Sequence, residues 1–95
     1  MDERKNIGIA EPLTEEKVNK SLAFKVVLFN DDWHTFDEVI WQLQKALGCS
    51  YEHARSIAFV VHVKGQSVVY SGELSQCLKV SSVLEEIALN TQVIS

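Results

Sequence analysis

The stretch FKVVLFNDDWHTFDE, residues 24–38, holds both the clearest strand pattern and the clearest helix start of the chain. Its first six residues are mostly β-branched or aromatic, which predicts a strand buried on at least one face. A polar turn follows, and Thr35 with Glu38 three residues later has the spacing of a capping box. We therefore predict a strand at 24–29 and a helix at 36–47.

Turn residues and apolar periodicity predict the remaining elements on the C-terminal side of this stretch. Gly48 suits the left-handed position after the first helix, and Ser50 can cap the next one. The pattern then predicts a helix at 51–61, a short strand at 67–70, a third and longest helix at 73–89, and an edge strand at 91–94. The order β-α-α-β-α-β indicates an α+β fold, with a three-stranded, mainly antiparallel sheet packed on three helices.

Length and composition indicate one small domain. The chain has 95 residues, 46% of them apolar, and a formal net charge of −4. We place the domain at 23–95, after an N-terminal tail at 1–22 that is expected to be mobile because it has little apolar mass. Scattered lysines and arginines in an acidic chain argue against a nucleic-acid partner. No apolar run suits a membrane span or a signal peptide, so we expect a cytoplasmic monomer with reduced cysteines.

Two polar sites that interrupt apolar runs indicate a small pocket with a polar mouth. Asn30 and Asp31 follow the first strand, and His62 lies in the run IAFVVHV at 57–63. Amide, carboxylate and neutral imidazole acceptors suit a cation with several N–H donors, and an ammonium group is the simplest such ligand. Four apolar neighbours could line a hole for a hydrophobic side chain: Phe36, Val39, Ala58 and Val61. An α-amino group attached to a large apolar side chain would satisfy both halves of this pocket.

Each of these residues also has a purely structural interpretation. The run Asn30-Asp31-Asp32 is typical of a turn before a helix, and His62 is typical of an imidazole near a helix C-terminus. Trp33 and Trp41 fit packing or exposed aromatic positions better than binding positions. A metal site or an acid–base set would use Asp31, Asp32, His34 and His62. The chain contains no HExxH, CxxC, phosphate loop or nucleophile elbow, so we do not expect an enzyme.

The segments KVVLFNDD at 25–32 and VVHVKG at 60–65 resemble the two signature segments of the ClpS family, the adaptors of the Clp protease. The resemblance covers roughly residues 24–90 and implies a non-enzymatic adaptor without a cofactor or metal. Such an adaptor binds proteins whose N-terminal residue is Leu, Phe, Tyr or Trp. It hands them to a AAA+ unfoldase of the ClpA or ClpC type.

The resemblance also implies roles for individual residues of this chain. The family positions that hold the substrate's α-amino group are matched by Asn30, Asp31 and His62. The positions that line the side-chain pocket are matched by Val39, Ala58 and Val61. Phe36 stands where the family commonly has a methionine that gates the pocket against β-branched side chains.

Other positions are implied less directly by the resemblance. Asp32, His34 and Thr35 are neighbours of the pocket, and His34-Thr35 replaces the family's usual Thr-Pro. Val93 or Ile94 would supply the apolar residue that the family's final strand adds to the pocket. The unfoldase contact is matched by Glu73 and Lys79, and the tail matches the extension that the unfoldase engages during delivery. The alternative is a domain of the same fold that binds an unfoldase or another partner without recognising N-termini.

Overall fold

The computed structural model describes residues 24–95, which form a three-stranded sheet with three helices. The elements run in the order β2 (Phe24–Phe29), α2 (Phe36–Leu47), α3 (Tyr51–Lys64), β3 (Gln66–Gly72), α4 (Leu74–Glu85) and β4 (Asn90–Ile94). The strand order is β3-β2-β4, and both pairs are antiparallel. The predicted α+β fold is therefore confirmed. The tail predicted at 1–22 lies outside the described residues.

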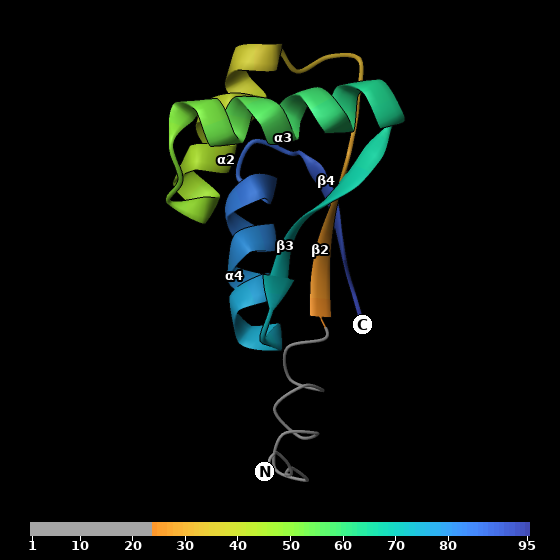
Figure 1. Cartoon of the computed structure of the whole chain (residues 1–95). Helices are drawn as coiled ribbons and strands as arrows, with labels where there is room; N and C mark the ends of the chain where they lie inside the picture. The colour runs from red at the N-terminus through yellow and green to blue at the C-terminus, as the bar shows by residue number, and fades with distance from the viewer. Residues whose placement is uncertain (1–23) are drawn as a thin grey trace, which may run out of the picture.

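The helices are arranged so that one end of the sheet is covered. Helix α4 contacts all three strands, whereas α2 contacts α3 and α4, and α3 reaches β3. In Figure 1, α4 stands alongside the sheet, and α2 and α3 lie across the end at which β2 finishes. The side chains that are fully buried between these elements are Val26, Leu28, Ile40, Leu43, Ala54, Cys77 and Leu84. None of the helices in residues 24–95 is long and apolar enough to cross a membrane.

The predicted capping box fixes the start of α2. Thr35 Oγ1 accepts from the Glu38 backbone N–H at 3.1 Å, and Glu38 Oε1 accepts from the Thr35 N–H at 2.9 Å. Gly48 ends the helix with φ 65°, the left-handed conformation that glycine adopts readily. Both bounds of this helix agree with the prediction, because local signals determine them.

The ends of the other two helices differ from the prediction. Helix α3 does not stop at residue 61 but continues to Lys64, where Gly65 at φ 87° donates its N–H to the Val61 carbonyl. The prediction that the last helix is the longest was wrong, since α4 has 12 residues and α3 has 14. Helix α4 ends at Glu85, and a turn follows at 86–88, in which Ala88 adopts φ 63°, outside the helical region. Strand β3 is longer than predicted and covers Gln66–Gly72.

The pairing of β2 with β3, which sets Phe29 opposite Gln66, brings the end of β2 close to the end of α3, and one further backbone hydrogen bond extends it. The Asn30 N–H donates to the carbonyl of Gly65 at 2.9 Å, and Gly65 directly follows α3. The polar residues after β2 and the last turn of α3, which carries His62, therefore lie at the same end of the molecule. This is the end that α2 and α3 cover.

Candidate functional site

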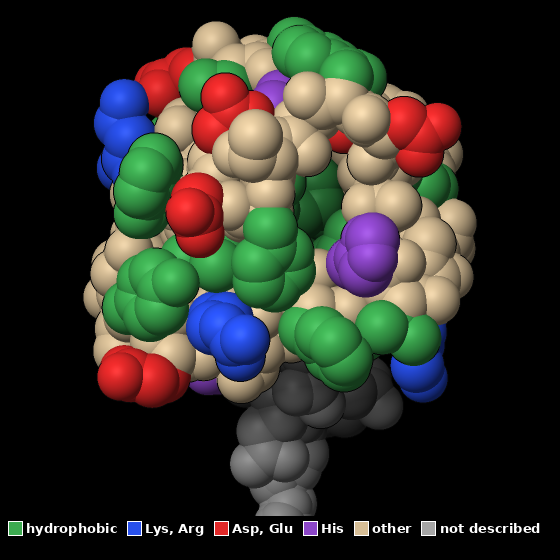
Figure 2. Space-filling model, turned by 90° about the horizontal axis from the view of Figure 1, so that it is seen from above, with side chains coloured by type: hydrophobic (Ala, Val, Ile, Leu, Met, Phe, Trp, Pro, Cys, Tyr) green, Lys and Arg blue, Asp and Glu red, His purple; other side chains and the backbone are tan. Residues whose placement is uncertain are grey.

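A pocket of about 500 Å³ opens at this end of the molecule. The view from above shows hydrophobic side chains inside a recess in this face (Figure 2). Its lining includes nine residues that sequence analysis singled out: Asn30, Asp31, Asp32, His34, Phe36, Val39, Ala58, Val61 and His62. The volume falls within the roughly 300–1,000 Å³ that is typical of small-ligand sites. The fold thus gathers residues of β2, α2, α3 and the loop at 30–35 around one cavity.

The inner wall of the pocket is apolar. Ala58 and Val61 project from α3 with 2% and 3% of their surfaces exposed, and Val39 lies on α2. Sequence analysis missed four lining residues: Leu28, Phe29, Phe59 and Leu89. The expectation that Val93 or Ile94 completes the wall was wrong, because the chain between α4 and β4 places Leu89 there instead. Since Leu89 lies outside regular secondary structure, no periodic pattern marks it in the sequence.

The gate candidate Phe36 lies at the start of α2 and lines the pocket with 38% of its surface exposed. The Arg55 guanidinium of α3 lies 5.9 Å from the centre of its ring, within reach of a cation–π interaction. Thr35, predicted as a pocket neighbour, is absent from the lining because its side chain caps α2. The Phe36 ring therefore contacts α3 through Arg55, and its exposed part can contact a ligand in the pocket.

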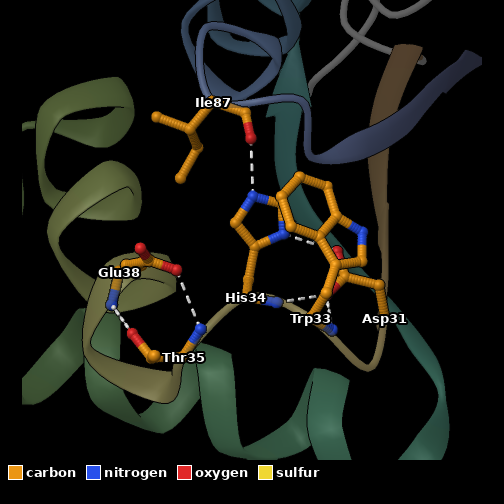
Figure 3. Close-up of polar contacts among 6 residues, drawn as sticks. All are labelled: Asp31, Trp33, His34, Thr35, Glu38 and Ile87. Atoms are coloured by element: carbon orange, nitrogen blue, oxygen red, sulfur yellow. Dashed lines mark hydrogen bonds and ion pairs between the residues drawn. The ribbon is translucent and has the colours of Figure 1, made fainter.

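Asp31 is engaged within its own loop. Its Oδ1 accepts from the backbone N–H groups of Trp33 at 3.1 Å and His34 at 2.9 Å, and its Oδ2 lies 2.7 Å from Nδ1 of the His34 ring (Figure 3). A carboxylate has about four acceptor positions, so about one remains for a ligand. Asp32 also lines the pocket, is exposed, and has no side-chain hydrogen bond to the rest of residues 24–95.

His34 is a buried cation, because both of its ring nitrogens face acceptors. Nε2 lies 2.5 Å from the Ile87 carbonyl oxygen, which can only accept, and Nδ1 faces the Asp31 carboxylate. Both nitrogens must therefore carry protons. The side chain is only 3% exposed, and the ring of Trp33 packs over it with the ring centres 3.8 Å apart. From the sequence, His34 was predicted only as a neighbour of the pocket, and the structure shows that its ring bonds to both Asp31 and Ile87.

The pKa directions agree with an ionised Asp31–His34 pair. Burial acts to lower the pKa of His34, but the hydrogen bonds to Asp31 and Ile87 and the nearby carboxylates outweigh it and raise this pKa above 6.5. Burial acts to raise the pKa of Asp31, but hydrogen bonds from His34 and Trp33 outweigh it and bring this pKa below 3.8. Both directions favour the charged forms of the two side chains, in agreement with the hydrogen-bond geometry.

The predicted unfoldase contacts lie away from the pocket. Glu73 is the N-cap of α4, Lys79 lies in its second turn, and both are exposed. In Figure 1, this start of α4 lies at the opposite end of the molecule from α2 and α3. Within residues 24–95, no group of three or more His, Cys, Asp and Glu side chains is placed to hold a metal ion.

Comparisons with known proteins agree with this fold. A family model described as "ATP-dependent Clp protease adaptor protein ClpS" matches residues 19–92. The ClpS adapter protein of Bartonella quintana is 33% identical over 86 residues, which cover 88% of this chain and 77% of that protein. Human E3 ubiquitin-protein ligase UBR2 is 37% identical over 73 residues, which cover 77% of this chain but only 4% of the ligase.

A solved structure of Agrobacterium tumefaciens ClpS2, bound to L-phenylalaninamide, has the same fold. It matches with a TM-score of 0.70 at 21% identity, over 75% of this chain and 93% of that chain. The family match, at residues 19–92, spans the first five elements of the described structure and the start of β4, including both segments that meet at the pocket. The chain therefore belongs to the ClpS family of adaptors of the ATP-dependent Clp protease.

Proposed function

We propose that this protein binds proteins with Leu, Phe, Tyr or Trp at the N-terminus and delivers them to a AAA+ unfoldase of the ClpA or ClpC type. The observation that carries the proposal is the two-part chemistry of the pocket. Its wall of Val39, Ala58 and Val61 suits a large apolar side chain, and its mouth contains several hydrogen-bond acceptors. An N-terminal residue presents this combination, because an internal residue has no ammonium group.

The α-ammonium group is assigned to the mouth of the pocket. Its N–H donors match the amide oxygen of Asn30 and a ring nitrogen of His62 as acceptors. Asp31 contributes its remaining acceptor position and Asp32 contributes negative charge. The apolar side chain then enters between α2 and α3. The phenylalaninamide bound by the Agrobacterium relative has the same two features, a free α-amino group and an apolar ring, which supports this assignment.

A peptide panel tests the recognition half of the proposal. Fluorescent peptides that differ only at residue one are measured against the full chain by anisotropy. We expect Phe, Leu, Tyr and Trp to bind about ten- to a hundredfold more tightly than Ala, because burying a large apolar side chain contributes about 1.5–3 kcal/mol. Equal affinity for Phe and Ala would instead favour an interaction domain that does not read N-termini.

Replacing Phe36 by alanine is expected to admit β-branched N-termini. Removal of the ring widens the entrance that Phe36 shares with α3, so affinity for Ile and Val peptides should rise about tenfold, the scale of a small steric change in an apolar pocket. Trp41→Ala is the matched control, because Trp41 is a 60% exposed aromatic of the same helix outside the pocket lining. If affinity for Ile and Val peptides is the same in both variants, Phe36 does not limit which side chains enter the pocket.

Delivery to an unfoldase predicts that substitutions at the exposed start of α4 weaken binding of the unfoldase and leave peptide binding unchanged. Lys79→Glu should weaken binding to a ClpA- or ClpC-type hexamer about tenfold at low salt, since it reverses a charge in the assigned contact, and should leave peptide affinity unchanged. Lys64→Glu, an exposed lysine at the end of α3, is the control. Co-sedimentation with the hexamer measures how much of each variant binds. If Lys79→Glu and Lys64→Glu bind equally well, Lys79 is not part of the unfoldase contact.

A further inference from the structure

His34 joins two segments that are far apart in the sequence. Its Nδ1 donates to Asp31 at 2.7 Å, in the loop after β2, and its Nε2 donates to the carbonyl of Ile87 at 2.5 Å, just after α4 (Figure 3). The two bonded positions, His34 and Ile87, are 53 residues apart. A cation at this point also lies near the C-terminal end of α4, where the helix dipole favours positive charge.

The segment that His34 holds forms part of the pocket wall. Two residues after Ile87, Leu89 is 4% exposed and lines the pocket. Between them Ala88 adopts φ 63°, a conformation that is unfavourable for a non-glycine residue and persists only where surrounding contacts enforce it. The position of Leu89 therefore depends on the contacts that fix this turn.

Two side chains bond to this region, and only His34 bonds to the backbone of the turn itself. His34 bonds to Ile87 on the pocket side. Gln42 of α2 donates its Nε2 to the Val83 carbonyl at 2.6 Å and to Glu86 Oε1 at 3.1 Å, and it is absent from the pocket lining. Gln42 thus anchors the end of α4 without touching the pocket, so it provides a matched control for His34.

We propose that His34 is a positioning residue of the pocket, which holds Leu89 in the wall through the Ile87 carbonyl and uses Asp31 as its counter-ion. The polar groups that face the ring are the Asp31 carboxylate and the Ile87 carbonyl, with the Glu38 carboxylate nearby, and the Trp33 ring packs over it. A neutral ring could donate to only one of its two acceptors. Loss of the Ile87 bond would release the segment after α4, and loss of the Asp31 bond would free the ring within its own loop.

The first test uses no ligand. In methyl-labelled protein, His34→Ala should shift the Leu89 methyl resonances, whereas Gln42→Leu should leave them in place. Unchanged Leu89 resonances in folded His34→Ala protein would overturn the inference, whatever the protein binds. If His34→Ala does not fold, the wild type supplies the measurement, because the Leu89 methyl groups should then titrate together with the His34 ring nitrogens. Leu89 methyl groups that stay fixed while the ring titrates would contradict the inference equally.

The second test uses a peptide with a free N-terminal Phe and rests on the proposed function for its ligand. His34→Ala should bind it about tenfold more weakly than the wild type, the range of a lost apolar contact in a binding pocket, and Gln42→Leu less than twofold more weakly. Equal losses in the two variants, or none in His34→Ala, would overturn the inference. A wild type that binds no such peptide contradicts the proposed function instead, and the methyl measurement still decides the role of His34.

Discussion

Replacing Asp31 by asparagine is expected to lower the free energy of unfolding by about 2–4 kcal/mol at pH 6. The change keeps the shape of the side chain but removes the charge that compensates the buried imidazolium of His34. Breaking a buried ion pair by removing one partner costs about 3–5 kcal/mol, and the 19% exposure of the Asp31 side chain reduces this figure somewhat. Urea unfolding followed by circular dichroism measures the difference.

The neighbouring carboxylate provides the control for this prediction. Asp32→Asn removes the same charge from the next position, but Asp32 is exposed and has no side-chain hydrogen bond to the described residues. Its effect on the free energy of unfolding should stay within about 0.5 kcal/mol, as for most surface substitutions. Equal effects of the two substitutions would show that the Asp31–His34 pair contributes nothing beyond general surface charge.

The pH dependence of this stability follows from the two pKa shifts. His34 has a raised pKa in the folded state, so its contribution is complete below 6.5 and is lost as the pH rises through the folded value. Asp31 has a lowered pKa, so its contribution is complete above 3.8 and is lost as the pH falls through the folded value. The difference between the wild type and Asp31→Asn should therefore be largest between these two limits and shrink as the pH rises through the raised pKa of His34.

Acetylation of the peptide N-terminus is expected to weaken binding of an N-terminal Phe peptide at least about a hundredfold. It removes the positive charge and two N–H donors from the group that we assign to Asn30 and His62. Charge-assisted hydrogen bonds contribute on the order of 1.5–3 kcal/mol each, and about 2.7 kcal/mol corresponds to a hundredfold change. Isothermal titration of the free and acetylated peptides measures the effect.

A second acetylation site in the same peptide separates recognition of the N-terminus from general charge. A peptide acetylated only on a lysine side chain near its C-terminus loses one positive charge but keeps the α-ammonium group, and it should bind nearly as well as the free peptide. Equal weakening by the two acetylations would mean that the acidic surface attracts any cation. In that case, the acceptors at the mouth would not recognise an N-terminus.

The ends of a helix were predicted correctly where residues next to them in the sequence determine them. Helix α2 is bounded by the Thr35 capping box and by Gly48, and its predicted ends agree with the structure. Helix α4 was predicted too long because the apolar residues of 86–89 continue the helical period. The chain leaves the helix there while His34 and Gln42, both distant in sequence, bond to its end. Contacts between residues that are distant in sequence cannot be predicted from a periodic pattern.

The pocket residues likewise divide into those that the sequence indicates and those that contacts with distant residues position. Asn30 and His62 were predicted to share a pocket because both interrupt apolar runs. The pairing of β2 with β3 and the bond from Asn30 to Gly65 bring these segments together. Sequence reasoning gave His34 only a peripheral position and missed Leu89. Both depend on a hydrogen bond to the Ile87 carbonyl, which no spacing rule indicates. That Asp31 is largely used within its own loop also became visible only in the structure.

The central claim is that the apolar part of the pocket holds the first side chain of a bound protein. Intermolecular NOEs between the ring protons of an N-terminal Phe peptide and methyl-labelled protein test it most directly. We predict NOEs to methyl groups of Val39, Val61 and Leu89, which line the pocket. NOEs confined to Leu74 and Leu78, two exposed leucines of α4 outside the pocket lining, would contradict the claim.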